Sequence, residues 1–153
     1  MKSFAVIVLL VLAVGCGGAS RIIVRDVIQI RPLLADDPLA TKFDAKDGST
    51  VGCGDPVLTD QLISYTYFKK TADSASFDLY VVMTERGAAQ WKTYTRRTGK
   101  TAAFLLDGSV LLSFPAEAAA DKAAIKVVIA SAAASQEEAD ALQLRLDKKK
   151  STK

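Results

Sequence analysis

Apolar and polar side chains alternate along two neighbouring stretches of the chain, residues 62–70 and 76–83. A period of two is typical of β-strands, because successive side chains point to opposite faces. A short polar stretch at residues 72–75 separates them, so we predict an antiparallel hairpin. The side chains expected to share a face are Ile63, Tyr65 and Tyr67 in the first strand, and Phe77, Leu79, Val81 and Met83 in the second.

Further strands are predicted where β-branched and other apolar residues recur between turn residues, at residues 21–34, 101–106, 110–114 and 124–130. Asp107-Gly108 is a typical two-residue hairpin turn. Residues 35–56 are rich in proline, glycine and aspartate, and we expect them to be mostly turn and loop.

Two segments have the spacing and end residues of helices. Thr84 is a suitable N-cap, and the first helix should end at Gly99, a residue that accepts the left-handed conformation. Ser135 and Glu138 form a capping box for the second helix. Ala88, Trp91 and Thr95 recur at helical spacing along one face of the first helix, and Ala139, Leu142 and Leu146 form the expected buried stripe of the second.

The order of these elements predicts an α+β fold. Helices separated by antiparallel hairpins favour an antiparallel or mixed sheet with two helices packed on one face, and ferredoxin-like topology is the nearest standard case.

The triplet Gly99-Lys100-Thr101 matches the end of a phosphate-binding loop. Such a loop needs a glycine five residues earlier, where this chain has Tyr94, and it must open a helix rather than precede a strand. We therefore expect no bound nucleotide.

The first residues have the pattern of a targeting segment. Lys2 precedes an apolar run from Phe4 to Val14, which is shorter than the roughly 20 residues that cross a bilayer. We divide the chain into a signal peptide (1–15), a linker (16–20), one α+β domain (21–147) and a basic tail (148–153).

Cys16 follows this run directly. Residues 13–16 resemble the lipobox of bacterial lipoproteins, in which the cysteine is acylated and becomes the mature N-terminus, with ordinary secretion as the alternative. Acylation would anchor the domain to a membrane. Gly17 implies the outer membrane by the sorting rule of enteric lipoproteins, with the domain in the periplasm. Cys53 would then be either a buried thiol or half of an intermolecular bridge.

Composition removes several classes of function. The 153 residues carry 20 basic and 17 acidic side chains, so no strong net charge favours nucleic acid as a partner. Histidine is absent, which removes the commonest general base and zinc ligand, and two cysteines cannot build a thiolate zinc site. We expect no metal and no cofactor.

Residues 54 to 147 carry a series of weak motifs in one order. The series resembles the head subdomain of the first periplasmic domain of SecD, in the SecDF family. One departure is Val127-Val128, where the family usually has a glycine. The matching residues are Gly54-Asp55-Pro56-Val57-Leu58-Thr59, Gly87-Ala88, Trp91, Gly99-Lys100, Leu106-Asp107-Gly108-Ser109-Val110, Pro115 and Ser135-Gln136-Glu137-Glu138-Ala139.

SecD and SecF assist polypeptide export, and their proton-driven work depends on charged residues in membrane-spanning helices. This resemblance implies, for the present chain, only the passive part of that role: contact with an exported polypeptide or an envelope partner.

Three tyrosines are the candidate contact residues for a polypeptide: Tyr65, Tyr67 and Tyr80. The sheet face or its edge would provide the surface. The alternative is a purely structural envelope protein, in which these rings cover the core and keep their hydroxyls in water.

We expect no enzyme, because no serine has a partner base in a known pattern. Aspartates in the 35–56 segment could approach a calcium ion, but their spacing matches no known loop. The lysine-rich tail is either a solvated end or a contact for anionic lipid.

Overall fold

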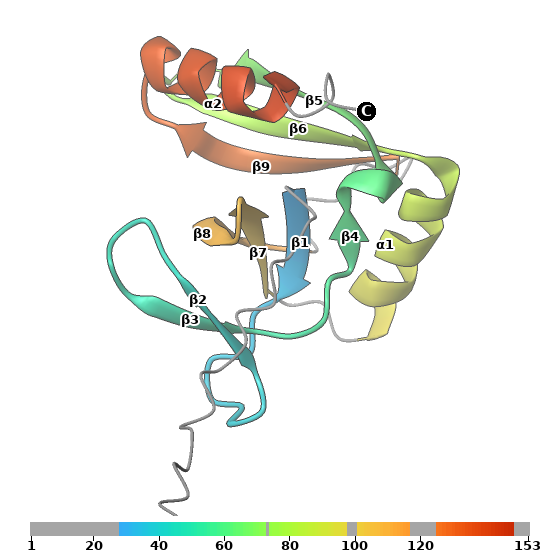
Figure 1. Cartoon of the computed structure of the whole chain (residues 1–153). Helices are drawn as coiled ribbons and strands as arrows, with labels where there is room; N and C mark the ends of the chain where they lie inside the picture. Colours follow the sequence, from blue (N-terminus) through green and yellow to red (C-terminus); the bar gives the residue numbers. More distant parts are fainter. Residues whose placement is uncertain (1–27, 73, 98–100, 117–124, 149–153) are drawn as a thin grey trace, which may run out of the picture.

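The computed structural model describes residues 28–72, 74–97, 101–116 and 125–148. Over these residues, strands and two α-helices make up an α+β fold, which confirms the expected class (Figure 1). The strands are β1 (Ile28–Pro32), β2 (Thr41–Asp44), β3 (Thr50–Cys53), β4 (Leu58–Thr59), β5 (Ile63–Lys70), β6 (Phe77–Met83), β7 (Thr101–Leu106), β8 (Ser109–Pro115) and β9 (Lys126–Ala133). The helices are the short 3₁₀ turn η1 (Asp60–Leu62), α1 (Glu85–Arg97) and α2 (Gln136–Lys148).

The described strands form three antiparallel sheets, which corrects the expectation of a single ferredoxin-like sheet. One sheet has the order β4-β1-β7-β8, a second has the order β5-β6-β9, and β2 pairs with β3. Ile30 of β1 and Leu79 of β6 belong to the same buried cluster. The two larger sheets stack face to face, so the apolar face of each sheet is buried against the other. If the sheets were joined edge to edge instead, these two faces would not cover each other.

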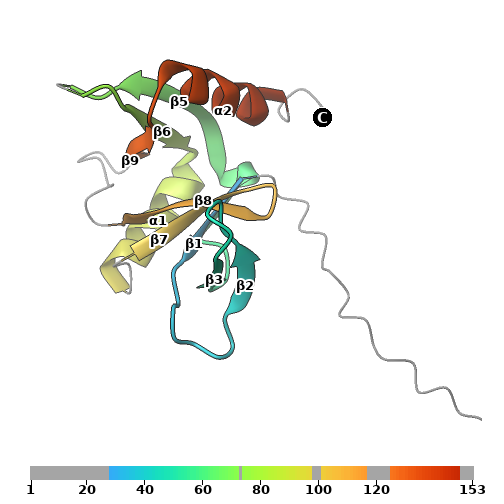
Figure 2. The same ribbon diagram turned by 90° about the vertical axis from the view of Figure 1, so that its left-hand side faces the viewer.

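Both α-helices pack on the inward side of the three-stranded sheet, as the sequence indicates. Trp91 of α1 and Leu146 of α2 lie in the cluster that contains Leu79 and Val81 of β6. Figures 1 and 2 show α2 lying beside β5 at one end of the molecule. The opposite face of this sheet is therefore the one that no described helix covers.

The hairpin of β2 and β3 contradicts the prediction that residues 35–56 are mostly turn and loop. Its strands have four residues each, and in β2 only Phe43 is buried. Such a strand shows no period of two in its sequence. Phe43 packs with Cys53, Leu105 and Val110 in a second cluster on the far side of the four-stranded sheet. Long-range packing, rather than local pattern, produces this hairpin.

Helix ends agree with the sequence where the structure describes them. Thr84 Oγ1 accepts a hydrogen bond from Gly87 N at 3.1 Å, and Ser135 Oγ accepts one from Glu138 N at 3.2 Å. The Glu138 carboxylate reaches back to Ala134 N, one residue before the expected partner. Gly99, the predicted end of α1, lies outside the described residues.

Neither α1 nor α2, at 13 residues each, is long and apolar enough to span a bilayer.

Candidate functional site

Three tyrosines from two strands form one row on the outer face of the three-stranded sheet. Tyr67 of β5 lies opposite Tyr80 of β6, and their rings stack with centroids 4.8 Å apart and an interplanar angle of 10°. Tyr65 stacks on Tyr67 at 6.0 Å. The structure thus brings together all three tyrosines that the sequence singled out. We call this row, with its neighbours Val82 and Val128, the tyrosine face.

Ile63 does not belong to this face, contrary to the prediction from its spacing. A bulge between Ile63 and Tyr65 changes the register of β5 against β6, and Ile63 turns inward with 5% of its surface exposed. A bulge inserts one residue and thereby moves the side chains before it to the other face. Sequence alternation alone cannot reveal such an insertion.

The stacking determines which part of each ring is presented. Tyr80 has Tyr67 on one side, and Lys126 Nζ lies 5.8 Å from its ring centroid. The two faces of the Tyr80 ring are therefore in contact with other side chains of the protein. The edge of the ring and its hydroxyl remain available for other contacts. Tyr65, at the end of the row, is 51% exposed. The row therefore consists of stacked aromatic rings that are held rigidly, with polar hydroxyl groups at their outer ends.

Both edges of the three-stranded sheet are interrupted. At the β5 edge, Gln143 of α2 donates from Nε2 to the carbonyl oxygen of Thr66 at 3.1 Å. In β9, the register against β6 shifts opposite Asp78, where Ser131 has a positive φ of 51° and its N–H donates to the Asp78 carboxylate. Bulges and occupied backbone groups discourage the addition of another strand. On this sheet, the face is more open to a partner than the edges are.

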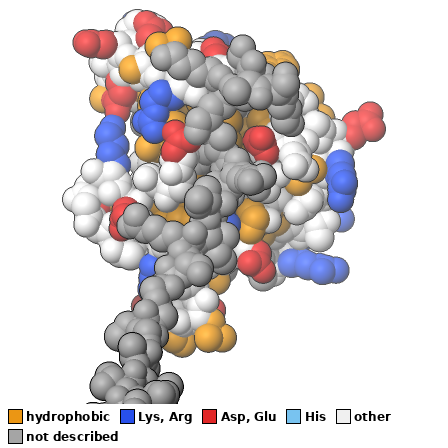
Figure 3. Space-filling model, in the orientation of Figure 1, with side chains coloured by type: hydrophobic (Ala, Val, Ile, Leu, Met, Phe, Trp, Pro, Cys, Tyr) orange, Lys and Arg blue, Asp and Glu red, His pale blue; other side chains and the backbone are white. Residues whose placement is uncertain are grey.

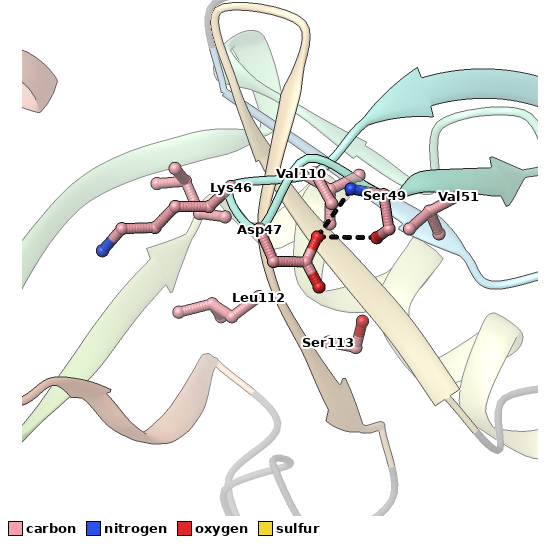
Figure 4. A pocket seen from close by; sticks show the side chains of 9 residues that line it. Lys46, Asp47, Ser49, Val51, Val110, Leu112 and Ser113 are labelled. Atoms are coloured by element: carbon pink, nitrogen blue, oxygen red, sulfur yellow. Dashed lines mark hydrogen bonds between the residues drawn. The ribbon is translucent and has the colours of Figure 1, made fainter.

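A groove runs along β8 on the other sheet. It has a volume of about 430 Å³ and lies between the β2–β3 loop and the strand (Figure 4). Asp47 closes its own turn by accepting bonds from the hydroxyl and then the N–H of Ser49, which hold the pKa of Asp47 below its usual value of 3.8. In the same loop, Lys46 forms an ion pair with Glu138 of α2. No local pattern indicates this pair, because its members are 92 positions apart.

Polar side chains are buried beneath the β2–β3 hairpin. Arg31 donates from Nε to Gln29 Oε1 at 2.6 Å and from a terminal nitrogen to Gly54 O at 2.7 Å. Its guanidinium lies 4.8 Å from the ring centroid of Phe43. The hydrogen bonds and the ring contact offset part of the cost of burying the charge.

Cys53 is a free thiol with no exposed surface, which agrees with the buried-thiol alternative. Burial raises the pKa of this thiol above 9.0, and nearby Arg31 opposes part of that rise. A thiol in this position cannot reach another chain unless the hairpin moves. Cys16, the predicted lipidation site, lies outside the described residues.

Charged side chains form no concentrated site in the part of the chain that the structure describes. No three carboxylates or thiols there lie close enough to hold a metal ion. Figure 3 shows acidic and basic side chains interspersed on one face of the molecule.

The fold resembles solved structures of SecDF. One, described as a membrane component that enhances protein export, matches with a TM-score of 0.56 and 19% identity over 80% of this chain and 62% of that chain. Another, the super-membrane-facing form of SecDF, matches with a TM-score of 0.55 and 20% identity over 80% of this chain and 18% of that chain. This confirms the resemblance to a SecD domain at the level of the fold. No protein-family model and no curated protein matches the sequence.

Proposed function

We propose that this chain is an envelope lipoprotein whose SecD-like domain contacts an extended polypeptide through the tyrosine face. The observation that carries the proposal is the union of Tyr65, Tyr67 and Tyr80 in one row on the face that no described helix covers. Rigid tyrosines supply contact area at a low cost in conformational entropy, because each ring has only two rotatable bonds.

The composition of the face favours a polypeptide over a charged ligand. The rings and the neighbouring valines Val82 and Val128 offer apolar area, while the hydroxyls can bond to backbone groups. Lys69 lies opposite Asp78 at one end, so neither sign of charge dominates there. We expect weak binding, micromolar or weaker, because ordering a flexible peptide costs several kcal/mol.

A purely structural role is the second candidate. The mutual stacking of Tyr67 and Tyr80 favours it, because rings that use their faces on each other need no partner. In that case the row stiffens an exposed sheet, and the hydroxyls simply stay in water. Neither candidate involves turnover of a small substrate, and we propose no catalytic residue.

The test is a titration of the full chain, in detergent micelles, with an unfolded secretory protein while backbone amide shifts are recorded. We expect shifts at Tyr65, Tyr67 and Tyr80, and the double substitution Tyr65→Ser/Tyr67→Ser should weaken binding about tenfold. Leu144→Ser is the matched control, because Leu144 is 55% exposed on α2, away from the row. The absence of shifts at millimolar polypeptide would leave the structural role as the better account.

The anchor is tested separately. Metabolic labelling with a fatty acid should mark the wild-type chain and not Cys16→Ala, because the acyl groups of a lipoprotein attach to the residue that follows the signal peptide. Fractionation of the labelled protein between inner and outer membranes then tests its localisation. Label that persists in Cys16→Ala rules out this lipidation site.

A further inference from the structure

β8 is an edge strand of the four-stranded sheet, and most of its outer edge has no strand paired with it among the described residues. The edge strand at the other side of that sheet, β4, has two residues, and both edges of the three-stranded sheet are interrupted as described above. Within the described part of the chain, only the start of β8 has a backbone pairing on its outer side, the parallel bridge between Ala45 and Val110.

The hydrogen-bond pattern shows which backbone groups face this edge. Leu33 N donates to Thr101 O at 3.1 Å, so Thr101 directs its backbone toward β1. In an antiparallel ladder the direction alternates, so Ala103, two residues on, also faces β1. Ser113 lies directly opposite Ala103. Ser113 therefore directs its N–H and carbonyl away from β7, toward the open edge.

The protein's own chain shows that this edge accepts a parallel strand. Lys46 N donates to Val110 O at 3.1 Å, and the chain then turns away at Asp47 and Gly48. The groove continues past this point along Leu111, Leu112 and Ser113 (Figure 4). About five residues of β8, roughly 16 Å of strand, have no strand paired on their outer side among the described residues.

Charge and polarity around the edge indicate what would fit. A second hollow shares Lys46, Leu111 and Leu112 with the groove and is lined mainly by apolar side chains of β8 and α2. The charges at its rim are matched, because Lys46 pairs with Glu138 and Arg145 pairs with Asp107. The rim of this second hollow therefore favours neither acidic nor basic segments, and the groove itself adds one carboxylate, Asp47, which is bonded to Ser49.

We propose that the β8 edge binds an extended polypeptide segment with apolar side chains at alternate positions, as an added strand that continues the Ala45–Val110 bridge. This inference rests on the proposed function, since it assumes that the domain meets extended chain. It adds a second surface, on another sheet, that recognises backbone rather than side chains.

The experiment measures amide exchange in the full chain, in micelles, with and without a short peptide of alternating valine and threonine carrying a lysine at each end. We expect the Ser113 amide to exchange about tenfold more slowly when the peptide is bound. A peptide with the same sequence but N-methylated at alternate residues is the matched control. It keeps the side chains and lacks the backbone donors, so it should give no protection.

Two substitutions give an independent measure. Ser113→Pro removes the edge N–H and should weaken peptide binding about tenfold, whereas Ser113→Ala keeps the N–H and should bind like the wild type. Equal binding of the plain and N-methylated peptides by the wild type overturns the proposal, whether or not Ser113→Pro folds. Shifts confined to the tyrosine face overturn it while sparing the proposed function, and no binding of any polypeptide overturns both.

Discussion

At the scale of single residues, Gly87 shows how closely α1 approaches the rest of the molecule. Gly87 is buried in the first turn of α1, and a Cβ at this position would lie well inside contact distance of the carbonyl of Leu62. That carbonyl also accepts the N–H and hydroxyl of Thr84. The same backbone group thus positions the helix cap and excludes a side chain at Gly87.

We predict that Gly87→Ala destabilises the protein by about 1–3 kcal/mol, because the clash with rigid backbone exceeds the gain of about 1 kcal/mol that alanine gives a helix. Urea denaturation at neutral pH measures the difference. Gln90→Ala, at an exposed position of the same helix, should change stability little. A more stable Gly87→Ala protein would contradict the close approach.

At the scale of elements, Glu138 connects the start of α2 to the β2–β3 loop. Its carboxylate pairs with Lys46 and accepts a hydrogen bond from Ala134 N at 2.9 Å. The Lys46 bond first, and the Ala134 bond second, hold the pKa of Glu138 below its ordinary value of 4.5. A depressed pKa contributes stability that is present above pH 4.5 and is lost as the pH falls through the folded-state value.

We predict that Glu138→Gln lowers the free energy of unfolding by up to about 1 kcal/mol at pH 7, which is the range for exposed ion pairs. The amide can still accept a hydrogen bond from Ala134 N, but it carries no charge to pair with Lys46. Its loss of stability between pH 7 and pH 3 should be smaller than that of the wild type. Glu137→Gln, the neighbouring exposed position, should keep the wild-type pH dependence. Identical pH profiles for Glu138→Gln and wild type would show that the ion pair does not act in solution.

The β2–β3 hairpin gives a second prediction at this scale. Phe43→Ala should remove most of the packing that holds the hairpin over Cys53, so the buried thiol should react with a thiol reagent about tenfold faster or more. A Cys16→Ala background leaves Cys53 as the single thiol. Phe77→Ala, in a different cluster, tests whether any loss of packing has the same effect. Equal reactivity of the two variants would mean that the hairpin does not open on its own.

At the scale of the whole molecule, the sequence predicts the elements better than their assembly. The alternation in Phe77–Met83 and the caps at Thr84 and Ser135 are local, and all three are confirmed. The sheet partners of each strand depend on stacking between distant segments, which no local period records. The same reason explains why the three tyrosines could be chosen from the sequence, whereas the open edge at Ser113 could not.

The placement of the aromatic side chains also gives the protein two separate optical signals. Trp91, the one tryptophan of the sequence, has no exposed surface and packs against Tyr94 and Phe114, so its emission reports the integrity of the core. The nearly parallel rings of Tyr67 and Tyr80 lie on the surface, where their coupled transitions contribute to the near-ultraviolet circular dichroism. Unfolding should change both signals. A partner that binds the tyrosine face should change the near-ultraviolet circular dichroism and leave the fluorescence emission of Trp91 unchanged.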